Sequence, residues 1–206
     1  MMRVLIARPS PFARKVRVAL REKGIEHEEV IENPWIPGTT VPASNPLGKV
    51  PVLFLDDGSV VHGSPVIIEY LETLPASVKL LPPPGAARVA HRQIEAVADG
   101  VCDAVVLLVL ERARSVQSPD WVARQMKKVE AGCAALDVAL TGEWLVESRY
   151  GLADVATGCA LGYLDLRLPE FDWRARHPAL SAFFARIDAR PAFAATRPEA
   201  QAIPQQ

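Results

Sequence analysis

The chain has 206 residues, of which 50% are hydrophobic and 23% charged, a balance that is typical of a globular protein and excludes extended disorder. A formal net charge of −1 and a pI near 6.4 give no basic surface of the kind that binds nucleic acid. No apolar run approaches the ~20 residues that cross a bilayer, and the apolar start of the chain is too short for a signal peptide. We therefore expect a cytoplasmic protein with no nucleic-acid and no membrane partner.

The first 80 or so residues alternate between strand and helix signals. Apolar residues recur at helical spacing between Phe12 and Leu20, and Gly24 follows as a helix stop. The DDG run at 56–58, between two apolar stretches, indicates a hairpin turn. In chain order we expect a strand at 3–7, a helix at 11–23, a strand at 27–31, an irregular proline-rich connection at 33–46, strands at 51–55 and 59–62, and a helix at 64–74. Helices would then cover a small sheet in β-α-β, β-β-α order.

The remainder of the chain carries helix signals only, and the sequence LLPPPG at 80–85 separates the two regimes like a linker. We expect helices at 87–114, 119–140, 152–166, 178–189 and 191–196. The predicted organisation is an α/β domain at 1–78, a linker at 79–86 and an all-α domain at 87–206. The tail after Arg197 is expected to be loosely held.

Clustered basic residues and cysteines can each mark a binding site, but here we interpret both as structural. The basic residues Arg14, Lys15, Arg17, Arg21 and Lys23 alternate with apolar positions at helical spacing, which predicts one solvated helix face.

The cysteines Cys102, Cys133 and Cys159 lie far apart, form no CxxC pair and have no histidines at ligand spacing. Neither a disulfide framework nor a zinc site is supported, so no metal is expected.

Two serine-proline pairs, Ser10-Pro11 and Ser64-Pro65, each stand at the expected start of a helix. Serine is a favoured N-cap and proline a favoured first helical residue, so either pair alone is explained by a helix cap. A helix N-terminus also presents free N–H groups and partial positive charge, which favour a carboxylate or a thiolate nearby. Two such ends in one small domain could hold both ends of an anionic peptide thiol.

The third feature is Val50-Pro51, at the start of an expected strand, where proline is found at sheet edges, strand starts or bulges. A cis bond here would be unusual unless the structure held it. It would turn the N–H and C=O of Val50 outward, where an extended peptide could pair with them as an added strand. The order and spacing of the three features together favour one peptide-binding pocket.

These motifs resemble those of the glutathione S-transferase family, in its bacterial serine-type form. The resemblance covers nearly the whole chain and rests on residues 10–17 (SPFARKVR), 45–53 (NPLGKVPVL) and 63–71 (GSPVIIEYL). It implies a thioredoxin-like βαβ-ββα domain followed by a helical bundle. It also implies glutathione as co-substrate, a small hydrophobic electrophile as second substrate, a detoxifying role and a homodimer.

Carried over residue by residue, the family makes Ser10 the catalytic candidate, facing the glutathione sulfur. Val50 would pair with the cysteinyl backbone before a cis Pro51, and Ser64 would bind the γ-glutamyl carboxylate. The candidates for glutathione binding are Phe12, Lys49, Val50, Pro51, Gly63, Ser64 and Asp99. Because a free thiol with a pKa of about 8.5 is mostly protonated at neutral pH, a hydroxyl donor and a helix N-terminus would favour the nucleophilic thiolate. The implied reaction is attack of that thiolate on an electrophilic carbon, aided by orientation.

One position departs from the family pattern. The family commonly has Glu or Asp where this chain has Gly63, so one polar contact to the γ-glutamyl group is missing. The backbone of Gly63 could still bind, and Asp99, beside the helix-weakening Gly100, is a candidate to reach the ligand's ammonium from a partner subunit. Ser10 remains open as a catalyst or as a binding residue only.

The resemblance also gives roles to the second domain. Asp154 fits position N3 of a capping box in which Gly151 replaces the usual hydroxyl, and Tyr150 with Val155 would form the hydrophobic staple. We therefore interpret Asp154 as structural.

The electrophile pocket is expected near Asp103, Val106, Leu107 and Leu110 on the long helix. Trp35 either lines the glutathione cleft or only packs, and the tyrosines and histidines are interpreted as packing or surface residues.

Three functions stay open at this point. The first is a glutathione transferase or a glutathione-dependent dehalogenase, isomerase or disulfide reductase. The second is a non-catalytic or weakly active glutathione-binding protein, and the third is a protein that docks peptides at the Val50-Pro51 edge without glutathione. Ser10, Val50-Pro51 and Ser64 favour the first, whereas Gly63 keeps the second open.

Overall fold

Four short strands form a mixed sheet in the first part of the chain. They are β1 (Met2–Ile6), β2 (His27–Ile31), β3 (Val52–Phe54) and β4 (Val60–His62). The structure, a computed structural model, describes residues 1–76 and 78–202. The strand order is β2-β1-β3-β4, with β1 parallel to β2 and the other neighbours antiparallel. The parallel pair needs a crossover and the β3–β4 pair only a tight turn, so the predicted β-α-β, β-β arrangement is confirmed.

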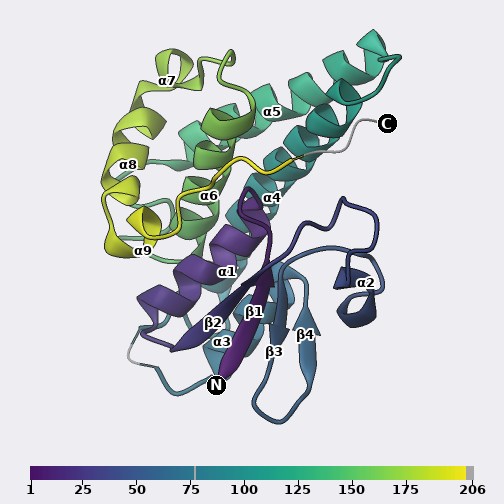
Figure 1. Ribbon diagram of the computed structural model, residues 1–206. Coiled ribbons are helices and arrows are strands. Elements are labelled where there is room, and N and C mark those ends of the chain that lie inside the picture. The colour runs from purple at the N-terminus through teal and green to yellow at the C-terminus, as the bar shows by residue number, and fades with distance from the viewer. Residues whose placement is uncertain (77, 203–206) are drawn as a thin grey trace.

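Three helices belong to this part: α1 (Pro11–Glu22), α2 (Val41–Ser44) and α3 (Ser64–Thr73). The short α2 corrects the expectation that 33–46 is wholly irregular. Pro42 falls in the first turn of α2, where a missing N–H costs no helical hydrogen bond. In Figure 1, α2 stands to the side of the sheet, away from α1.

The second half is helical, as predicted, with six helices in the described residues. They are α4 (Ala86–Arg112), α5 (Pro119–Ala139), α6 (Leu152–Arg167), α7 (Trp173–Arg176), α8 (Pro178–Asp188) and α9 (Pro191–Ala194). The single turn α7 was not expected from the sequence; Asp172 caps it by accepting the Ala175 N–H at 3.1 Å. No helix in the described part of the chain is long and apolar enough to cross a membrane.

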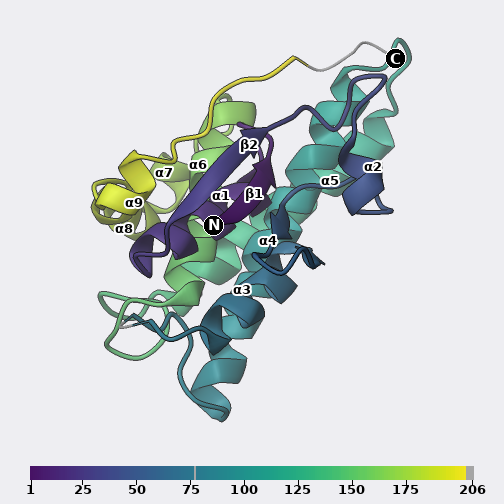
Figure 2. The ribbon, with the colours of Figure 1, turned by 60° about the horizontal axis from the view of Figure 1, so that its bottom comes forward.

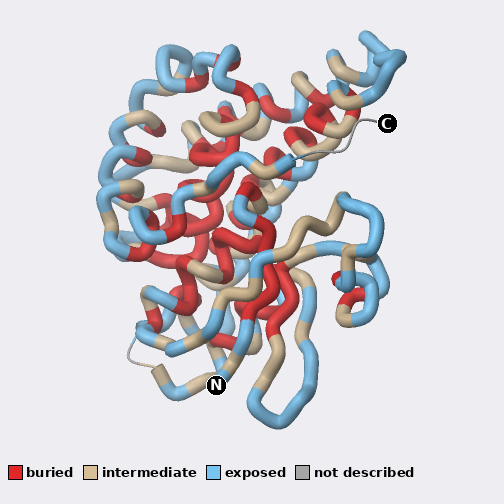
Figure 3. The backbone as a smooth tube through the Cα atoms, viewed as in Figure 1, coloured by how far each residue is buried: buried red, intermediate tan, exposed pale blue. Residues whose placement is uncertain are grey.

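One continuous core joins the two halves. Buried residues extend from β1 and β3 through α1 into α4 and α6 (Figure 3). Helix α1 contacts α3 on one side and α6, α9 and α4 on others, so it lies between the sheet and the helical half (Figure 1). The segment expected to be a linker is anchored too, because Leu80 and Leu81 are buried and the Leu80 carbonyl accepts the Leu152 N–H at 2.8 Å.

The position of α1 overturns the prediction of a solvated basic face. Arg14, Lys15 and Lys23 are buried, and each finds its partners on another element. Arg14 donates to the Phe193 carbonyl oxygen at 3.2 Å, and Lys23 pairs with Glu72 at 2.8 Å. Charges at helical spacing do not distinguish a face open to water from a face covered by a second domain with matching acceptors.

The segment after α9 returns toward the start of α1 and the end of β2 (Figure 2). Glu199 pairs with Arg8 at 2.6 Å, and the Asn33 amide donates to the Ala202 carbonyl oxygen at 2.8 Å. The tail was expected to be loosely held, but it makes specific contacts as far as Ala202. The last part of the tail, 203–206, lies outside the described residues.

Glu29 on β2 is held by two arginines of α1, Arg17 at 2.8 Å and Arg21 at 3.1 Å. Burial acts to raise the pKa of Glu29, but the nearby His27 ring, 3.7 Å away, and the hydrogen bond and charge of Arg17 prevail and lower it to about 2 from an ordinary value of 4.5. Because the folded-state pKa is depressed, ionised Glu29 stabilises the fold above the unfolded pKa, and this contribution is lost as the pH falls toward 2.

We expect Glu29→Gln to lower the free energy of unfolding at neutral pH by roughly 2 kcal/mol. The variant should also lose stability less steeply than wild type between roughly pH 5 and pH 2. Urea unfolding at a series of pH values measures both effects. Glu28→Gln, an exposed neighbour on the same strand, is the control, and equal acid slopes for all three proteins would contradict the assignment.

Candidate functional site

One edge of the sheet gathers the ends of three strands. Leu5, the penultimate residue of β1, pairs with Val52, which is the first residue of β3. Val52 in turn pairs with His62, the last residue of β4. The segments that follow β1 and β4 and the segment that precedes β3 therefore meet at the same edge.

Each of these segments carries one of the predicted motifs. Ser10 follows the end of β1 by four residues, Val50-Pro51 immediately precedes β3, and Ser64 is the second residue after β4. The sheet register thus brings together three motifs that lie up to 54 positions apart in the sequence.

Ser10 is the N-cap of α1, as predicted. Its Oγ accepts the Ala13 N–H at 3.2 Å, and its carbonyl oxygen accepts the Arg14 N–H at 2.9 Å. Since the cap uses only an acceptor position of the hydroxyl, the O–H itself is still available as a donor. In the first turn of the helix, Phe12 is partly buried and packs against the core, so it helps to fix the position of this helix end.

The Val50-Pro51 peptide bond is cis, as the resemblance implies. The loop before it is shaped by Asn45, to which sequence analysis gave no role. The Asn45 amide donates to the Lys49 carbonyl oxygen at 2.7 Å, and its Oδ1 accepts the Leu47 N–H at 3.1 Å. Asn45 is buried and so positions Lys49 and Val50; the signal in the sequence was its place at an Asn-Pro turn.

Ser64 differs from the expectation in one respect: it is the first residue of α3, and Gly63 is the N-cap. The Gly63 carbonyl accepts the Ile67 N–H at 3.0 Å. Gly63 has φ 84°, a backbone region that strains residues with a side chain. Glycine relieves that strain and at the same time removes the acidic side chain that the family commonly places here.

Asp99 is paired with a lysine of its own chain. Both of its carboxylate oxygens accept from Lys15 Nζ, at 2.8 and 2.6 Å, and Glu95 accepts from the same ammonium at 2.7 Å. Asp99 keeps 20% of its side chain exposed, whereas Lys15 is only 1% exposed. Its reach toward the ligand of a partner subunit stays a prediction.

The long helix α4 carries Asp103, one of the residues predicted for the electrophile pocket. Burial raises the pKa of Asp103, against the opposite pull of the nearby Lys49 and Lys15 charges. The two lysines belong to the loop before β3 and to α1. The place of Asp103 in a wall for the electrophile stays a prediction.

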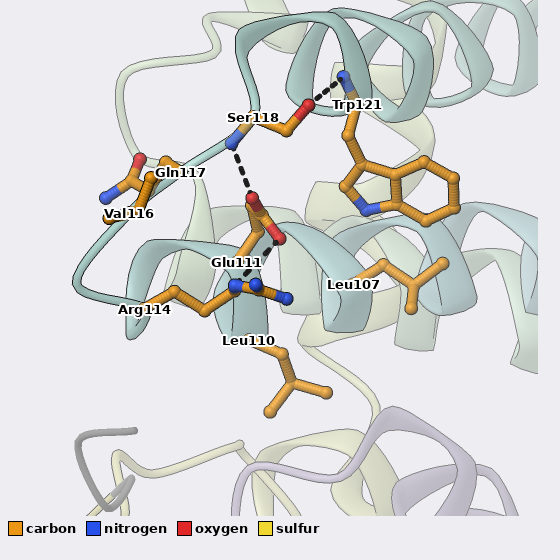
Figure 4. Close-up of a pocket in the computed structure, with 8 residues that line it drawn as sticks. All are labelled: Leu107, Leu110, Glu111, Arg114, Val116, Gln117, Ser118 and Trp121. Carbon is orange, nitrogen blue, oxygen red and sulfur yellow. Dashed lines mark hydrogen bonds and ion pairs between the residues drawn. The ribbon is translucent and has the colours of Figure 1, made fainter.

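A cavity of about 620 Å³ lies where α4 ends and α5 begins (Figure 4). Its apolar lining includes Leu107, Leu110, Val116 and Trp121, and its polar lining includes Glu111 and Arg114. Of the four residues predicted for the electrophile pocket, Leu107 and Leu110 line this cavity, whereas Asp103 and Val106 are not among its lining residues. Trp121 was missed because no local pattern tells that the start of α5 folds back over α4.

Other aromatic candidates have packing roles. Tyr163 is buried, and Trp35 and Tyr70 are partly buried against the core. Tyr150 donates to Glu22 at 3.2 Å and meets the Trp144 ring edge-on at 5.4 Å. For Trp35, partial burial fits both a packing role and a place in the cleft, so its role stays a prediction.

The start of α6 is capped from two directions. Asp154 accepts the N–H groups of Gly151 at 2.8 Å and Leu145 at 3.0 Å, which confirms its structural role. His91 of α4 accepts the Ala153 N–H through Nδ1 at 3.2 Å and so supplies the acceptor that Gly151 lacks. Burial lowers the pKa of His91 to about 4, so the ring is neutral at neutral pH and can accept.

The sheet order, the cis proline at the start of β3 and the helical half define a thioredoxin-like domain joined to an all-helical domain. Family models agree: "Glutathione S-transferase, N-terminal domain" matches residues 9–74, and "Glutathione S-transferase, C-terminal domain" matches residues 119–186. The chain belongs to the glutathione S-transferase family.

The similarity to known proteins extends over almost the entire chain. The uncharacterized GST-like protein YibF of Escherichia coli K12 is 36% identical over 96% of this chain and 98% of its own length. A glutathione S-transferase from Methylobacterium radiotolerans, solved in complex with glutathione sulfonate, is 47% identical over 100% of this chain and 98% of that chain, with a TM-score of 0.96. One from Methylobacillus flagellatus, solved with GSH bound, is 40% identical over 97% of this chain and 100% of that chain, with a TM-score of 0.93.

Proposed function

We propose that this protein is a glutathione transferase that conjugates glutathione to a small hydrophobic electrophile. The observation that carries the proposal is the meeting of Ser10, Val50-Pro51 and Ser64 at one edge of the sheet. The glutathione-type ligands in the two similar structures support the choice of thiol.

In this proposal each of the three motifs binds a different part of the glutathione tripeptide. The Ser10 hydroxyl donates to the glutathione sulfur, and the N-terminus of α1 lowers the thiol pKa, so the thiolate predominates. Val50 pairs with the cysteinyl backbone beside Pro51. Ser64 and the start of α3 bind the γ-glutamyl carboxylate.

The remaining candidates complete the pocket. Phe12 and Lys49 flank the thiol and the peptide backbone, Gly63 contributes backbone groups only, and Asp99 of a partner subunit holds the ammonium. The sulfur then attacks the electrophilic carbon and a leaving group departs with the bonding electrons. The cavity beside Leu107 and Trp121 takes the apolar part of the electrophile.

A second candidate is a weakly active or non-catalytic glutathione-binding protein. Gly63 favours it, because an acidic side chain at that position is missing from the γ-glutamyl end. For either candidate we infer a cytoplasmic homodimer with a glutathione-binding domain at 1–78, a linker at 79–86 and a helical domain at 87–206.

Conjugation of glutathione to an activated aryl halide tests Ser10. We expect Ser10→Ala to lower kcat/KM by roughly tenfold or more, because the donor to the thiolate is lost. Ser10→Thr keeps both the hydroxyl and the helix cap and should retain most of the activity. Equal rates for wild type and Ser10→Ala would favour the binding-protein candidate.

Isothermal titration calorimetry with glutathione tests the second motif. Ser64→Ala should weaken binding by roughly tenfold, since a hydrogen bond to a charged group is removed. Ser59→Ala, in the exposed turn between β3 and β4, is the control and should bind like wild type. Failure of wild type to bind glutathione would overturn both candidates.

A further inference from the structure

A second cavity, of about 370 Å³, lies beside the β1–β2 half of the sheet, and its lining includes Arg8, two residues before Ser10. It opens where α1, the ends of β1 and β2, and the segment after α9 meet. Since β2 is the edge strand farthest from β4, the cavity and Ser64 lie toward opposite edges of the sheet. None of the residues proposed for glutathione is among its lining residues.

The charged lining of this cavity carries a net positive charge. Four arginines, Arg8, Arg17, Arg21 and Arg197, face two carboxylates, Glu29 and Glu199. The formal charge of the lining is therefore +4 − 2 = +2. Asp188, a carboxylate outside the lining, pairs with Arg197 at 2.7 Å and also with Arg14, a buried arginine outside the lining, at 3.4 Å, so adding both groups leaves the balance at +2. Since each guanidinium has about five donor positions, the carboxylates leave much of this donor capacity unused.

Arg17 shows the shortage of acceptors most directly. Its side chain is only 12% exposed, and its Nε is buried with no hydrogen-bond partner. Its other contacts are the pair with Glu29 at 2.8 Å and a long bond of 3.4 Å to the Thr196 carbonyl oxygen. Because buried donors in folded proteins are nearly always paired, this cavity is short of an acceptor.

The uncharged lining is apolar. Ile6 and Ile31 pair across β1 and β2, and Ala194 and Ala195 of the α9 region also line the cavity. Ile31 is exposed, as is expected for an apolar wall that a ligand covers. The ligand therefore has a carbon skeleton in addition to its charged group.

We propose that this cavity binds a small phosphate monoester. A phosphate monoester carries a charge of roughly −1.5 to −2 at neutral pH, which balances the lining, and guanidinium forks match phosphate oxygens in geometry. The phosphoryl group lies among the four arginines, and the organic group lies against Ile31 and the two alanines. This site is separate from glutathione binding and does not depend on the proposed transferase activity.

Isothermal titration calorimetry with phenyl phosphate tests the site directly on the full chain. We expect binding at one site per chain, unchanged by saturating glutathione and weakened by added salt. Inorganic phosphate, which lacks the apolar group, and benzoate, which carries a single charge, should each bind more weakly by roughly tenfold. Displacement by glutathione would place phenyl phosphate in the glutathione site and overturn the proposal.

Two sets of variants locate the binding. Arg8 and Arg197 are 46% and 62% exposed, so Arg8→Gln with Arg197→Gln leaves the core intact, and we expect phenyl phosphate to bind roughly tenfold or more weakly. Arg124→Gln with Lys127→Gln, two exposed residues on α5, also removes two positive charges and is the control. Ile31→Glu should weaken binding, whereas Ile31→Gln, of nearly the same shape, should weaken it much less.

The outcomes are decisive in both directions. No binding of phenyl phosphate to wild type would overturn the proposal, and so would equal losses in the α5 control variant and the double arginine variant. Equal affinities for Ile31→Glu and Ile31→Gln would show that the phosphoryl group does not lie in this cavity. Circular dichroism of each variant confirms that the fold is kept.

Discussion

Lys15→Met is expected to lower the free energy of unfolding by roughly 3 kcal/mol, because it leaves the largely buried Asp99 without its cation and Glu95 with Arg92 as its remaining partner. Lys15 is 1% exposed and joins α1 to α4 through Glu95 at 2.7 Å and Asp99 at 2.6 Å. Burial acts to lower the Lys15 pKa, but the charges of Asp99 and Glu95 prevail and raise it above 10.5. The stabilisation by Lys15 is therefore fully present below about pH 10.5 and is lost as the pH rises through the folded-state pKa.

Urea unfolding at neutral and at alkaline pH measures this effect. Lys127→Met, an exposed lysine on α5, should change the stability by about 0.5 kcal/mol or less. Asp99→Asn added to Lys15→Met should restore part of the loss, because one uncompensated charge is removed. A Lys15→Met protein as stable as the Lys127→Met protein would show that the buried ion cluster does not hold α1 to the helical half.

The second large effect concerns Gly151. A Cβ at this position would lie 2.5 Å from His91 Cε1 and 2.7 Å from the Leu80 carbonyl oxygen, distances at which side-chain atoms do not fit. We expect Gly151→Ala to destabilise the protein by about 3 kcal/mol, measured as the shift in urea midpoint. The cost comes from space and not from backbone conformation, since φ at Gly151 is −162°, in the extended region.

Gly142→Ala is the matched control, because a Cβ there meets nothing within 4 Å. Combining Gly151→Ala with His91→Ala removes one of the two clashes. The double variant should therefore lose less free energy of unfolding than the sum of the losses in the two single variants. A Gly151→Ala protein with the stability of Gly142→Ala would mean that the chain can move apart at this junction without cost.

The secondary structure and the candidate site could be predicted from the sequence, whereas the packing around Lys15 and Gly151 could not. The helices and hairpin follow from local patterns: apolar spacing, serine-proline starts and the turn at 56–58 each lie within a few residues of the element they specify. The meeting of Ser10, Val50-Pro51 and Ser64 was predictable because strand order sets which segments share an edge. The fold and its family followed from these motifs together.

The features that were missed all depend on distant partners. The burial of Lys15 requires Glu95, 80 positions away, and the tight fit of Gly151 requires His91, 60 positions away. A glycine in place of the usual hydroxyl looked like a lost cap, whereas the structure supplies the cap from α4. Trp121 gave no sign of its place in the cavity because α5 folds back over α4 only in three dimensions.

The start of α6 has a consequence for how the chain tolerates insertions. The Leu80 carbonyl accepts the first N–H of α6, and the His91 ring accepts the second. Exposed connections usually accept extra residues at little cost. The proline-rich stretch between Leu80 and His91, although much of it faces water, has both of its ends tied to a single helix terminus, so its length is constrained like that of a core element.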